Sequence, residues 1–333
     1  MTSLTILIPT WDRPDEVNCR LQEIDSLWKG SSTVIIQVNP GRFDAGQIDP
    51  SLCRGRVLLR QNYSNLGMVA NIIHGISDVD TEWLWILGDD DKIRNDAKLH
   101  LDAGIEFAEA NQAAGILFNQ WPTDNPGGRI LSRSLDTFLA ATSFSDILFV
   151  TSFVWRLSFF QKNVATFIDY SYSRASHALI LLVSQVEGTS SILIENSPLV
   201  HYEYVVRWSR LDYLQRITTI FMHPSISLRT TKSKITELLW PQCRWALLSA
   251  AHEQLKSGEI TMVEWFSVAC SFSFHLLSSS RLKVSLKRAI YIFTIPLQIY
   301  HPLYFLQIVF DKLFGKVFGW LRTGKTDRLN RLR

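Results

Sequence analysis

Three carboxylates in a row, Asp89, Asp90 and Asp91, follow Gly88 at the end of the apolar run Trp83–Leu87. Like charges at this spacing repel one another unless a cation offsets them. Carboxylate oxygens are the ligands that Mg²⁺ and Mn²⁺ prefer, and the glycine allows a tight turn where a strand ends. The triplet therefore predicts a divalent-cation site. The alternative is a solvated acidic turn, or a helix N-cap formed by Asp91.

Other polar residues stand where the remaining apolar runs of the first 120 residues end. Pro9, Thr10, Asp12 and Arg13 close the first run, Asn39 closes the second, and Asn65, Gly67 and Asn71 follow the third. In an open α/β sheet, ligands sit beyond the carboxyl ends of the strands. These side chains are therefore the ones expected to meet a ligand.

The elements that must position these residues follow from hydrophobic spacing. Short apolar runs predict strands at 4–9, 33–38, 56–59, 83–87 and 114–118. Helical spacing between them predicts helices at 15–27, 65–76 and 97–111. Strands that are apolar on both sides, alternating with helices, predict a doubly wound, mostly parallel α/β sheet with helices on both faces.

The pattern changes after Trp121. Residues 144–160 are apolar and predict two short elements, a helix is expected over 172–186, and a strand over 191–200. From about residue 225 onward the chain is expected to be mostly helical. We therefore predict one domain over 1–215, with halves at 1–120 and 121–215, followed by a helical C-terminal region over 225–333.

Composition excludes several classes of protein. The chain has 333 residues, 47% of them apolar, which excludes a disordered polymer. Eleven Lys and Arg against two Asp give residues 281–333 a charge of +9, so the +3 of the whole chain leaves −6 for residues 1–280. A mildly acidic body argues against nucleic-acid binding. Four scattered cysteines favour a reducing compartment, and the absence of a basic leader before the first strand predicts no signal peptide.

The ordered strand-end motifs resemble those of the family 2 glycosyltransferases, which have the GT-A fold. Leu7–Pro14 is similar to that family's first strand and donor-binding turn, and Asp89–Asp91 to its DxD motif. Asn62–Gly67, with Asn71, resembles its N-x-G-x-x-x-N segment. Asn39 stands where the family usually has an Asp that reads the nucleotide base. Together the motifs cover about the first 120 residues in the family's order.

The resemblance implies a site for a nucleotide-diphosphate sugar and for Mn²⁺ or Mg²⁺. A carboxylate-held metal neutralises the negative charge that develops on a diphosphate leaving group. Asp89 and Asp91 would face the metal, and Asp90 the ribose or sugar. Thr10, Asp12 and Asn39 would bind base and ribose, and the nucleotide-sugar site would also include Pro9, Arg13, Asn65, Gly67 and Asn71. Arg13 would pair with phosphate or, alternatively, stand at a surface helix entry.

The acceptor side departs from the family's pattern. An inverting transfer needs a general base, which in the family is commonly a carboxylate in an acidic pair at a helix start. No such pair is present here, and the candidates are Asp169 and His177, whose alternatives are a loop or capping Asp and a helix-packing His. His201 would add a metal or phosphate contact, or would be a strand-end histidine with its own partners.

The carboxyl-terminal tail is the last distinctive segment. Residues 289–310 carry no formally charged side chain, yet they include Pro296 and Pro302, and basic residues flank both ends. This composition favours a broken amphipathic helix on an anionic leaflet; a buried helical pair and a membrane span are the alternatives.

The sequence thus predicts a metal-dependent, inverting glycosyltransferase of polysaccharide or glycolipid assembly. Its partners would be a nucleotide-diphosphate sugar donor, a saccharide or lipid-linked acceptor, and an anionic membrane surface. It would be cytoplasmic and peripherally attached to the cytoplasmic face of the membrane. The alternatives are a nucleotidyltransferase, whose basic glycine-rich phosphate loop is missing from the sequence, and a catalytically degenerate GT-A domain that acts as a membrane-associated scaffold.

Overall fold

The computed structural model describes residues 3–43, 45–119 and 128–201, together with 216, 218–227, 231, 234, 235 and 265. The chain divides into two compact units, Met1–Arg207 with Arg216–Gln242, and Trp208–Gln215 with Cys243–Arg333. The first unit holds every predicted site residue. Most of the predicted helical region over 225–333, and all of the tail over 289–310, lie outside the described residues.

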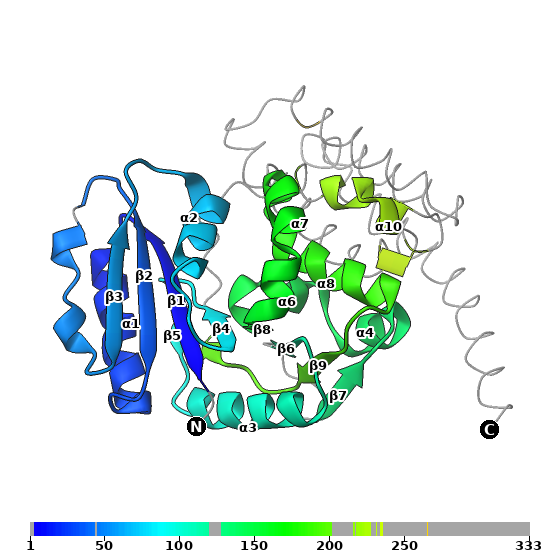
Figure 1. The fold of residues 1–333 in the computed structure, drawn as a ribbon, viewed down its shortest axis with the longest axis horizontal. Helices are drawn as coiled ribbons and strands as arrows, with labels where there is room; N and C mark the ends of the chain where they lie inside the picture. The colour runs from blue at the N-terminus through cyan, green and yellow to red at the C-terminus, as the bar shows by residue number, and fades with distance from the viewer. Residues whose placement is uncertain are drawn as a thin grey trace, which may run out of the picture. The chain divides into compact units, whose positions relative to one another are not determined.

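The first half of the described unit alternates strands and helices (Figure 1). Its elements are β1 (Leu4–Trp11), α1 (Pro14–Trp28), β2 (Thr33–Asn39), η1 (Ala45–Gln47), η2 (Pro50–Leu52), β3 (Arg56–Gln61), α2 (Gly67–Ile76), β4 (Trp83–Ile86), β5 (Lys92–Ile93), α3 (Ala97–Ala110) and β6 (Gly115–Phe118). All five predicted strands and all three predicted helices of this half are present.

The second half is more broken. Its elements are β7 (Arg129–Ser132), α4 (Leu135–Ala141), α5 (Phe144–Leu148), η3 (Val150–Ser152), β8 (Phe153–Arg156), α6 (Leu157–Lys162), α7 (Val164–Asp169), η4 (Ser171–Ser173), α8 (Ser176–Glu187), β9 (Ile192–Glu195), β10 (Val200–His201), η5 (Thr218–Met222) and α10 (Pro224–Ser227).

The strands form an eight-stranded sheet in the order β3-β2-β1-β4-β8-β6-β9-β7, within the part of the chain that is described. Pairs β1–β2, β1–β4, β2–β3 and β6–β9 are parallel, whereas β8 and β7 run antiparallel to their neighbours. Strands β1 to β4, β6 and β9 therefore all end at the same edge. The predicted mostly parallel α/β sheet is confirmed, and the order places β1, β2 and β4 side by side.

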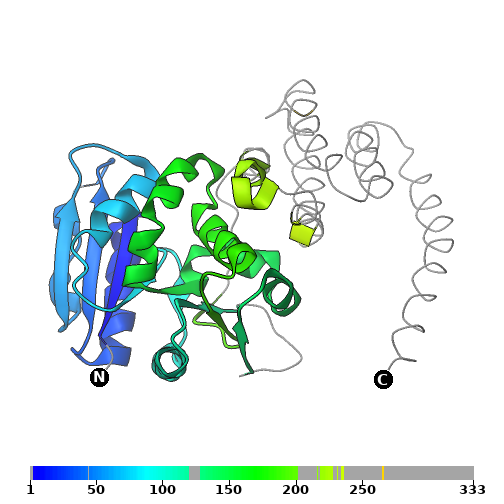
Figure 2. The same ribbon diagram turned by 45° about the vertical axis from the view of Figure 1, so that its right-hand side comes forward.

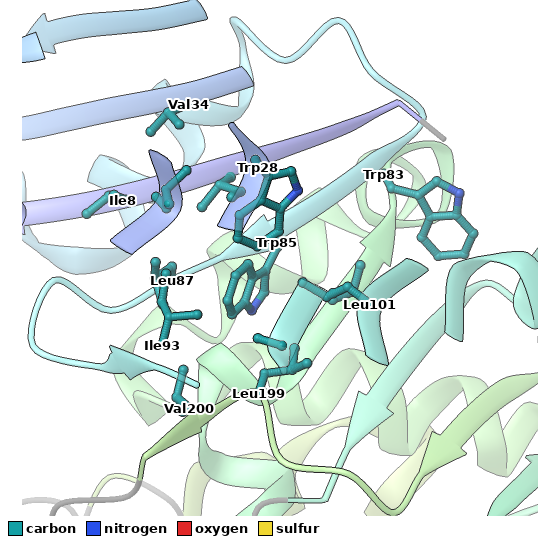
Figure 3. Close-up of a cluster of buried hydrophobic side chains, with 14 of the residues drawn as sticks. Ile8, Trp28, Val34, Trp83, Trp85, Leu87, Ile93, Leu101, Leu199 and Val200 are labelled. Carbon is teal, nitrogen blue, oxygen red and sulfur yellow. The ribbon is translucent and has the colours of Figure 1, made fainter. Parts of the chain in front are cut away.

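Helices cover both faces of this sheet, as predicted. Figures 1 and 2 show α3 on one side of the strands and α6, α7 and α8 on the other. The face that carries α1 and α3 buries a large apolar cluster, in which the Trp28 and Trp85 rings lie 6.4 Å apart between centroids (Figure 3). On the opposite face α2 packs closely, because a Cβ at Gly75 would lie 2.4 Å from Leu7 Cδ1.

Three predictions for the second half were wrong in detail. Residues 144–160 contain four short elements instead of two, and β8 lies antiparallel between β4 and β6. The helix expected over 172–186 begins at Ser176, since Arg174 adopts a left-handed φ of 56°. The strand expected over 191–200 is divided into β9 and β10. Each error concerns an element of six residues or fewer, or the boundary of a longer one, where apolar spacing alone does not settle the assignment.

Candidate functional site

The acidic turn begins directly at the carboxyl end of β4. The Leu87 N–H continues the pairing with β1 by donating to the Leu7 carbonyl at 2.9 Å, and the Asp91 N–H then closes a turn on the Gly88 carbonyl at 3.1 Å. A Cβ at Gly88 would stand 2.3 Å from Asp91 Oδ2. Only glycine therefore lets the Asp91 carboxylate fold back over the turn.

Asp89 points into the protein and is 7% exposed. Thr10 Oγ1 donates to its Oδ2 at 2.7 Å, and Arg13 Nη1 donates to its Oδ1 at 2.7 Å. Burial raises the pKa of Asp89 above its ordinary value, while the Arg13 charge and the Thr10 hydroxyl oppose that rise. Both oxygens of Asp89 thus accept a hydrogen bond from β1 or the turn after it, so these contacts fix the orientation of Asp89 within the site.

Arg13 joins two of the three carboxylates. The same Nη1 lies 2.8 Å from Asp90 Oδ2, and the Asp90 side chain is 41% exposed. Burial works against the guanidinium charge, but Asp89 and Asp90 together raise the pKa of Arg13. Arg13 stands at the entry of α1, as one of the two sequence interpretations placed it, but its side chain neutralises two carboxylates of the acidic turn.

Asp91 is held by a residue that the sequence did not single out. Thr151 Oγ1, in η3, donates to Asp91 Oδ2 and accepts the Gly88 N–H at 3.0 Å. Burial raises the pKa of Asp91 to about 6, and repulsion from Asp90 and Asp89 adds to the rise. A threonine beside a serine within an apolar stretch carries no sequence signal for this role, and only the fold brings it to the turn.

The donor set fits a hard divalent cation at Asp91. Arg13 offsets the charges of Asp89 and Asp90, whereas Asp91 forms no ion pair among the described residues and its pKa is raised mainly by burial, with Arg20 opposing the rise from a distance. Within the described residues, no three His, Cys, Asp or Glu side chains gather closely enough to hold a metal by themselves. A bound cation would therefore take its remaining ligands from water or from a bound diphosphate.

His201 stands beside the acidic turn on a second, small sheet. In β10 it lies opposite Lys92 of the antiparallel strand β5, which directly follows Asp91. The neighbouring Arg94 N–H donates to the Leu199 carbonyl at 3.0 Å and secures this pairing. The exposed His201 thus lies on the strand that pairs with the residue after Asp91. The side chains of Asp89, Asp91 and His201 nevertheless do not form a metal-binding group in the described structure.

Asp12 has a structural task that its predicted role did not anticipate. It adopts a left-handed φ of 57°, and its Oδ1 accepts the N–H groups of Arg42 and Phe43, at 2.5 and 3.1 Å. A Cβ at Gly41 would meet the same carboxylate at 1.9 Å. Asp12 thus caps the loop after β2 with one carboxylate oxygen, and its contact to base and ribose stays a prediction. With Thr10 and Arg13 it also lines a shallow pocket that reaches Ile48.

A buried network of carboxamides holds the donor-side loop. Asn39 Oδ1 accepts from Asn62 Nδ2 at 2.8 Å and from the Leu66 N–H at 3.2 Å, while its Nδ2 donates to the Gly67 carbonyl at 3.2 Å. Asn62 Nδ2 also donates to Asn71 Oδ1, at 2.7 Å. An aspartate at position 39 would lose the donor to Gly67 and bury a charge, so the network favours a neutral carboxamide at this position.

The remaining donor-side residues belong to the same network or border it. Asn71 Nδ2 donates to the Gln37 carbonyl at 2.9 Å, and Asn65 Oδ1 accepts the Gly67 N–H at 2.9 Å. Gly67 has φ of 77°, a conformation that favours glycine. Pro9, in β1, pairs in register with Gln37 of β2. The structure thus brings the predicted strand-end residues of β1, β2 and β3 together at one edge.

The two candidates for the general base have opposite environments. Asp169 is the last residue of α7 and is exposed. His177 lies in α8, is 3% exposed, and places its Nε2 2.9 Å from the Leu148 carbonyl. Burial lowers the pKa of His177 to about 4. This geometry corrects the assignment of His177 as a base, because the ring is enclosed and its Nε2 is occupied; it is the helix-packing histidine.

A mostly parallel sheet with polar strand ends at β1 and β2 and an acidic turn after β4 is the arrangement of the GT-A fold. The comparison with solved structures confirms this fold. The crystal structure of S. aureus TarS 1-349 matches with a TM-score of 0.58 at 12% identity, over 89% of this chain and 91% of that one. TarS 1-349 in complex with UDP-GlcNAc matches with a TM-score of 0.56 at 12% identity and the same coverage. A further crystal structure of S. aureus TarS, whose chain is longer, matches with a TM-score of 0.58 at 12% identity. This match covers 89% of this chain and 55% of that one.

No protein-family model matches the sequence, and the comparison with curated proteins finds no match.

Proposed function

We propose that the protein is a metal-dependent glycosyltransferase that moves a sugar, with inversion, from a nucleotide-diphosphate donor to a saccharide or lipid-linked acceptor in polysaccharide or glycolipid biosynthesis. The observation that carries the proposal is the acidic turn, in which Asp91 is held by Thr151 at the edge where β1, β2 and β4 end. The shared fold supports it, since TarS of that fold has been solved with UDP-GlcNAc.

The residues of the site divide the work of such a reaction. A divalent cation, Mn²⁺ or Mg²⁺, would supply charge neutralisation for the diphosphate leaving group. Asp91 would hold that cation, water and the diphosphate would complete its coordination, and Arg13 would keep Asp89 and Asp90 from repelling the donor. Asn65, Gly67 and the network around Asn39 and Asn71 would shape the place for the nucleotide.

The general base is assigned to Asp169. An inverting transfer needs a group that takes the proton of the acceptor hydroxyl. Asp169 is exposed, so an acceptor can approach it, whereas His177 is enclosed and hydrogen-bonded to Leu148. Asp169 is thus the candidate that can meet a substrate.

A binding screen tests the proposal. Purified full-length protein is titrated with a panel of nucleotide sugars, with Mn²⁺, with Mg²⁺, and with EDTA. We expect at least one donor to bind only when the metal is present, because Asp91 and the diphosphate share the cation. If no nucleotide sugar binds with either metal, the proposed function is wrong.

A variant of Asp169 separates binding of the donor from transfer of the sugar. With the donor found in that screen, Asp169→Asn should bind the donor as the wild type does and lose transfer by about 10²-fold or more. His177→Asn serves as the comparison, since a packing residue should change stability more than the ratio of transfer to binding. Normal transfer by Asp169→Asn would contradict the assignment of the base.

One observation favours a second candidate, a degenerate GT-A domain that serves as a membrane-associated scaffold. Arg13 already neutralises two of the three carboxylates, so the turn is held together without a metal. A scaffold would keep its function when Asp91 is replaced, whereas the enzyme would not. The Asp91 variant treated in the Discussion therefore decides between the two.

The basic tail supports a membrane-surface partner and, with it, a lipid-linked acceptor. Residues 281–333 carry a charge of +9 around an apolar stretch, which suits an anionic leaflet. Among the residues that the structure describes, no helix is both long and apolar enough to cross a membrane. We propose peripheral attachment at the cytoplasmic face.

Co-sedimentation with vesicles measures this attachment. The full chain should bind phosphatidylglycerol-containing vesicles at low salt, and binding should weaken in about 0.5 M salt because ions screen surface charge. A variant with Lys312, Lys316 and Arg322 replaced by Gln should bind less. Equal binding to neutral phosphatidylcholine vesicles would argue against an electrostatic attachment.

A further inference from the structure

The hydroxyl of Thr151 links the acidic turn to the second half of the domain. Thr151 is fully buried, and its side chain meets both ends of the turn, the Gly88 N–H and the Asp91 carboxylate. We infer that Thr151 is the positioning residue that orients Asp91 for the cation. The inference rests on the proposed function, and it adds a residue that neither the motifs nor the family resemblance indicates.

Hydrogen-bond chemistry fixes the direction of the Thr151 hydroxyl. A backbone N–H can only donate, so the hydroxyl oxygen must accept from Gly88. The single hydroxyl proton is then left for Asp91 Oδ2, where the geometry places it. One side chain thereby sets the conformation of the glycine and the rotation of the carboxylate together.

Thr151 is itself held in place from the sheet. The Trp85 indole Nε1, in β4, donates to the Thr151 carbonyl at 2.8 Å. Trp85 is fully buried, so this contact is not shared with solvent. The residue that orients Asp91 is therefore tied to the same strand from which the acidic turn emerges.

The segment that carries Thr151 is also anchored from the opposite face of the sheet. His177, in α8, contacts the Leu148 carbonyl at 2.9 Å, three residues before Thr151. Burial keeps His177 neutral, since its pKa is lowered to about 4. The histidine that the sequence suggested as a base thus stabilises the segment between α5 and β8.

With Oδ2 held by Thr151, Asp91 presents its other oxygen, which makes no hydrogen bond within the described residues. A carboxylate whose rotation is already fixed loses less entropy when it binds an ion. Groups that hydrogen-bond to a metal ligand typically contribute about 10–100-fold to metal affinity. Loss of the Thr151 hydroxyl should therefore weaken cation binding without removing a ligand.

The test replaces Thr151 by Val, which keeps the shape and removes the hydroxyl, and by Ser, which keeps the hydroxyl. Ser152→Ala is the matched control, because Ser152 is fully buried next to Thr151 and its Oγ has no hydrogen-bond partner in the described structure. The probe is Mn²⁺ alone, followed through the paramagnetic resonance signal of the free ion, with thermal melting to confirm folding.

We expect Thr151→Val to bind Mn²⁺ about tenfold more weakly or worse, Thr151→Ser to stay close to the wild type, and Ser152→Ala to be unchanged. Full affinity in Thr151→Val, or an equal loss in the Val and Ser variants, overturns the inference. If Thr151→Val does not fold, Thr151→Cys, a near-isosteric and weaker hydrogen-bonding group, takes its place, and undiminished affinity in it overturns the inference.

The same titration separates this inference from the proposed function. If the wild type binds Mn²⁺ and the Asp91→Asn variant does not, the proposed metal site is supported. The Thr151 variants then test the positioning role alone. If the wild type binds no Mn²⁺, the proposed metal site fails and the inference fails with it.

Discussion

Replacement of Asp91 by Asn is expected to abolish metal-dependent donor binding and, at the same time, to make the metal-free protein more stable at neutral pH. The first effect follows because Asp91 is the carboxylate of the turn that forms no ion pair among the described residues, so it is the one best suited to bind a metal. Loss of a metal ligand should reduce donor affinity and transfer by about 10²-fold or more. A scaffold without a metal would show neither loss.

The gain in stability follows from the pKa of Asp91. Burial raises this pKa from 3.8 to about 6 in the folded protein. Between these values the folded state binds more protons than the unfolded state, so stability falls as pH rises from about 4 to about 6 and is lowest above that. Asn carries no charge at any of these pH values, and its side-chain oxygen can still accept from Thr151. The variant should therefore be more stable by on the order of 1–3 kcal/mol above about pH 6, and by nothing below about pH 4.

Thermal melting of both proteins across pH, with and without Mn²⁺, checks both effects. Mn²⁺ should stabilise the wild type above about pH 6, where Asp91 is ionised, and should leave Asp91→Asn unchanged. Asp80→Asn is the control, because Asp80 is exposed and the Arg56 hydrogen bond lowers its pKa, so this variant should gain no stability. Metal-dependent donor binding that survives in Asp91→Asn would remove Asp91 from the site.

The gathering of polar strand ends at one edge of the sheet was predictable because each of its parts has a local signature. An apolar strand run followed by a polar strand end can be recognised within ten residues, and the parallel order of the strands then brings the ends together. The adjacency of Thr10 and Asp89, 79 positions apart, follows from β1 lying beside β4. The fold class and the location of the site thus follow from short-range patterns combined with one topological rule.

The contacts that fix each side chain were not predictable in the same way. Thr151 reaches Asp91 only because β8 lies antiparallel beside β4, and β8 lies within a long apolar stretch, 144–160, whose internal boundaries apolar spacing does not show. Asp12 caps a loop through a left-handed backbone conformation that no sequence pattern required of a non-glycine residue. Histidine often serves as a general base, but the burial of His177 depends on the packing of α8 against its neighbours. In each case a long-range contact decides the role of a side chain.

Arg13→Gln should be among the most destabilising substitutions of polar residues in this site. Asp89 is 7% exposed and would keep only the Thr10 hydroxyl as a partner, while Asp90 and Asp91 stand beside it. A buried carboxylate that loses its cationic partner must remain charged at a cost or take up a proton. We expect a loss of about 2–4 kcal/mol in the free energy of unfolding at neutral pH, which decreases toward acidic pH as Asp89 becomes protonated.

Denaturant unfolding of Arg13→Gln, Asp89→Asn and the double variant measures the interaction directly. The double variant should recover part of the loss, since it leaves no buried unpaired charge, and the coupling should be on the order of 1–3 kcal/mol. Arg60→Gln is the control, because the Arg60–Asp78 pair is exposed and such pairs contribute at most about 1 kcal/mol. Mn²⁺ should restore part of the stability of Arg13→Gln, because a divalent ion can offset the same carboxylates that Arg13 neutralises. Equal stability of Arg13→Gln and the wild type would mean that Arg13 is free to leave the turn at little cost, and its ion pairs could then no longer be regarded as what holds Asp89 in place.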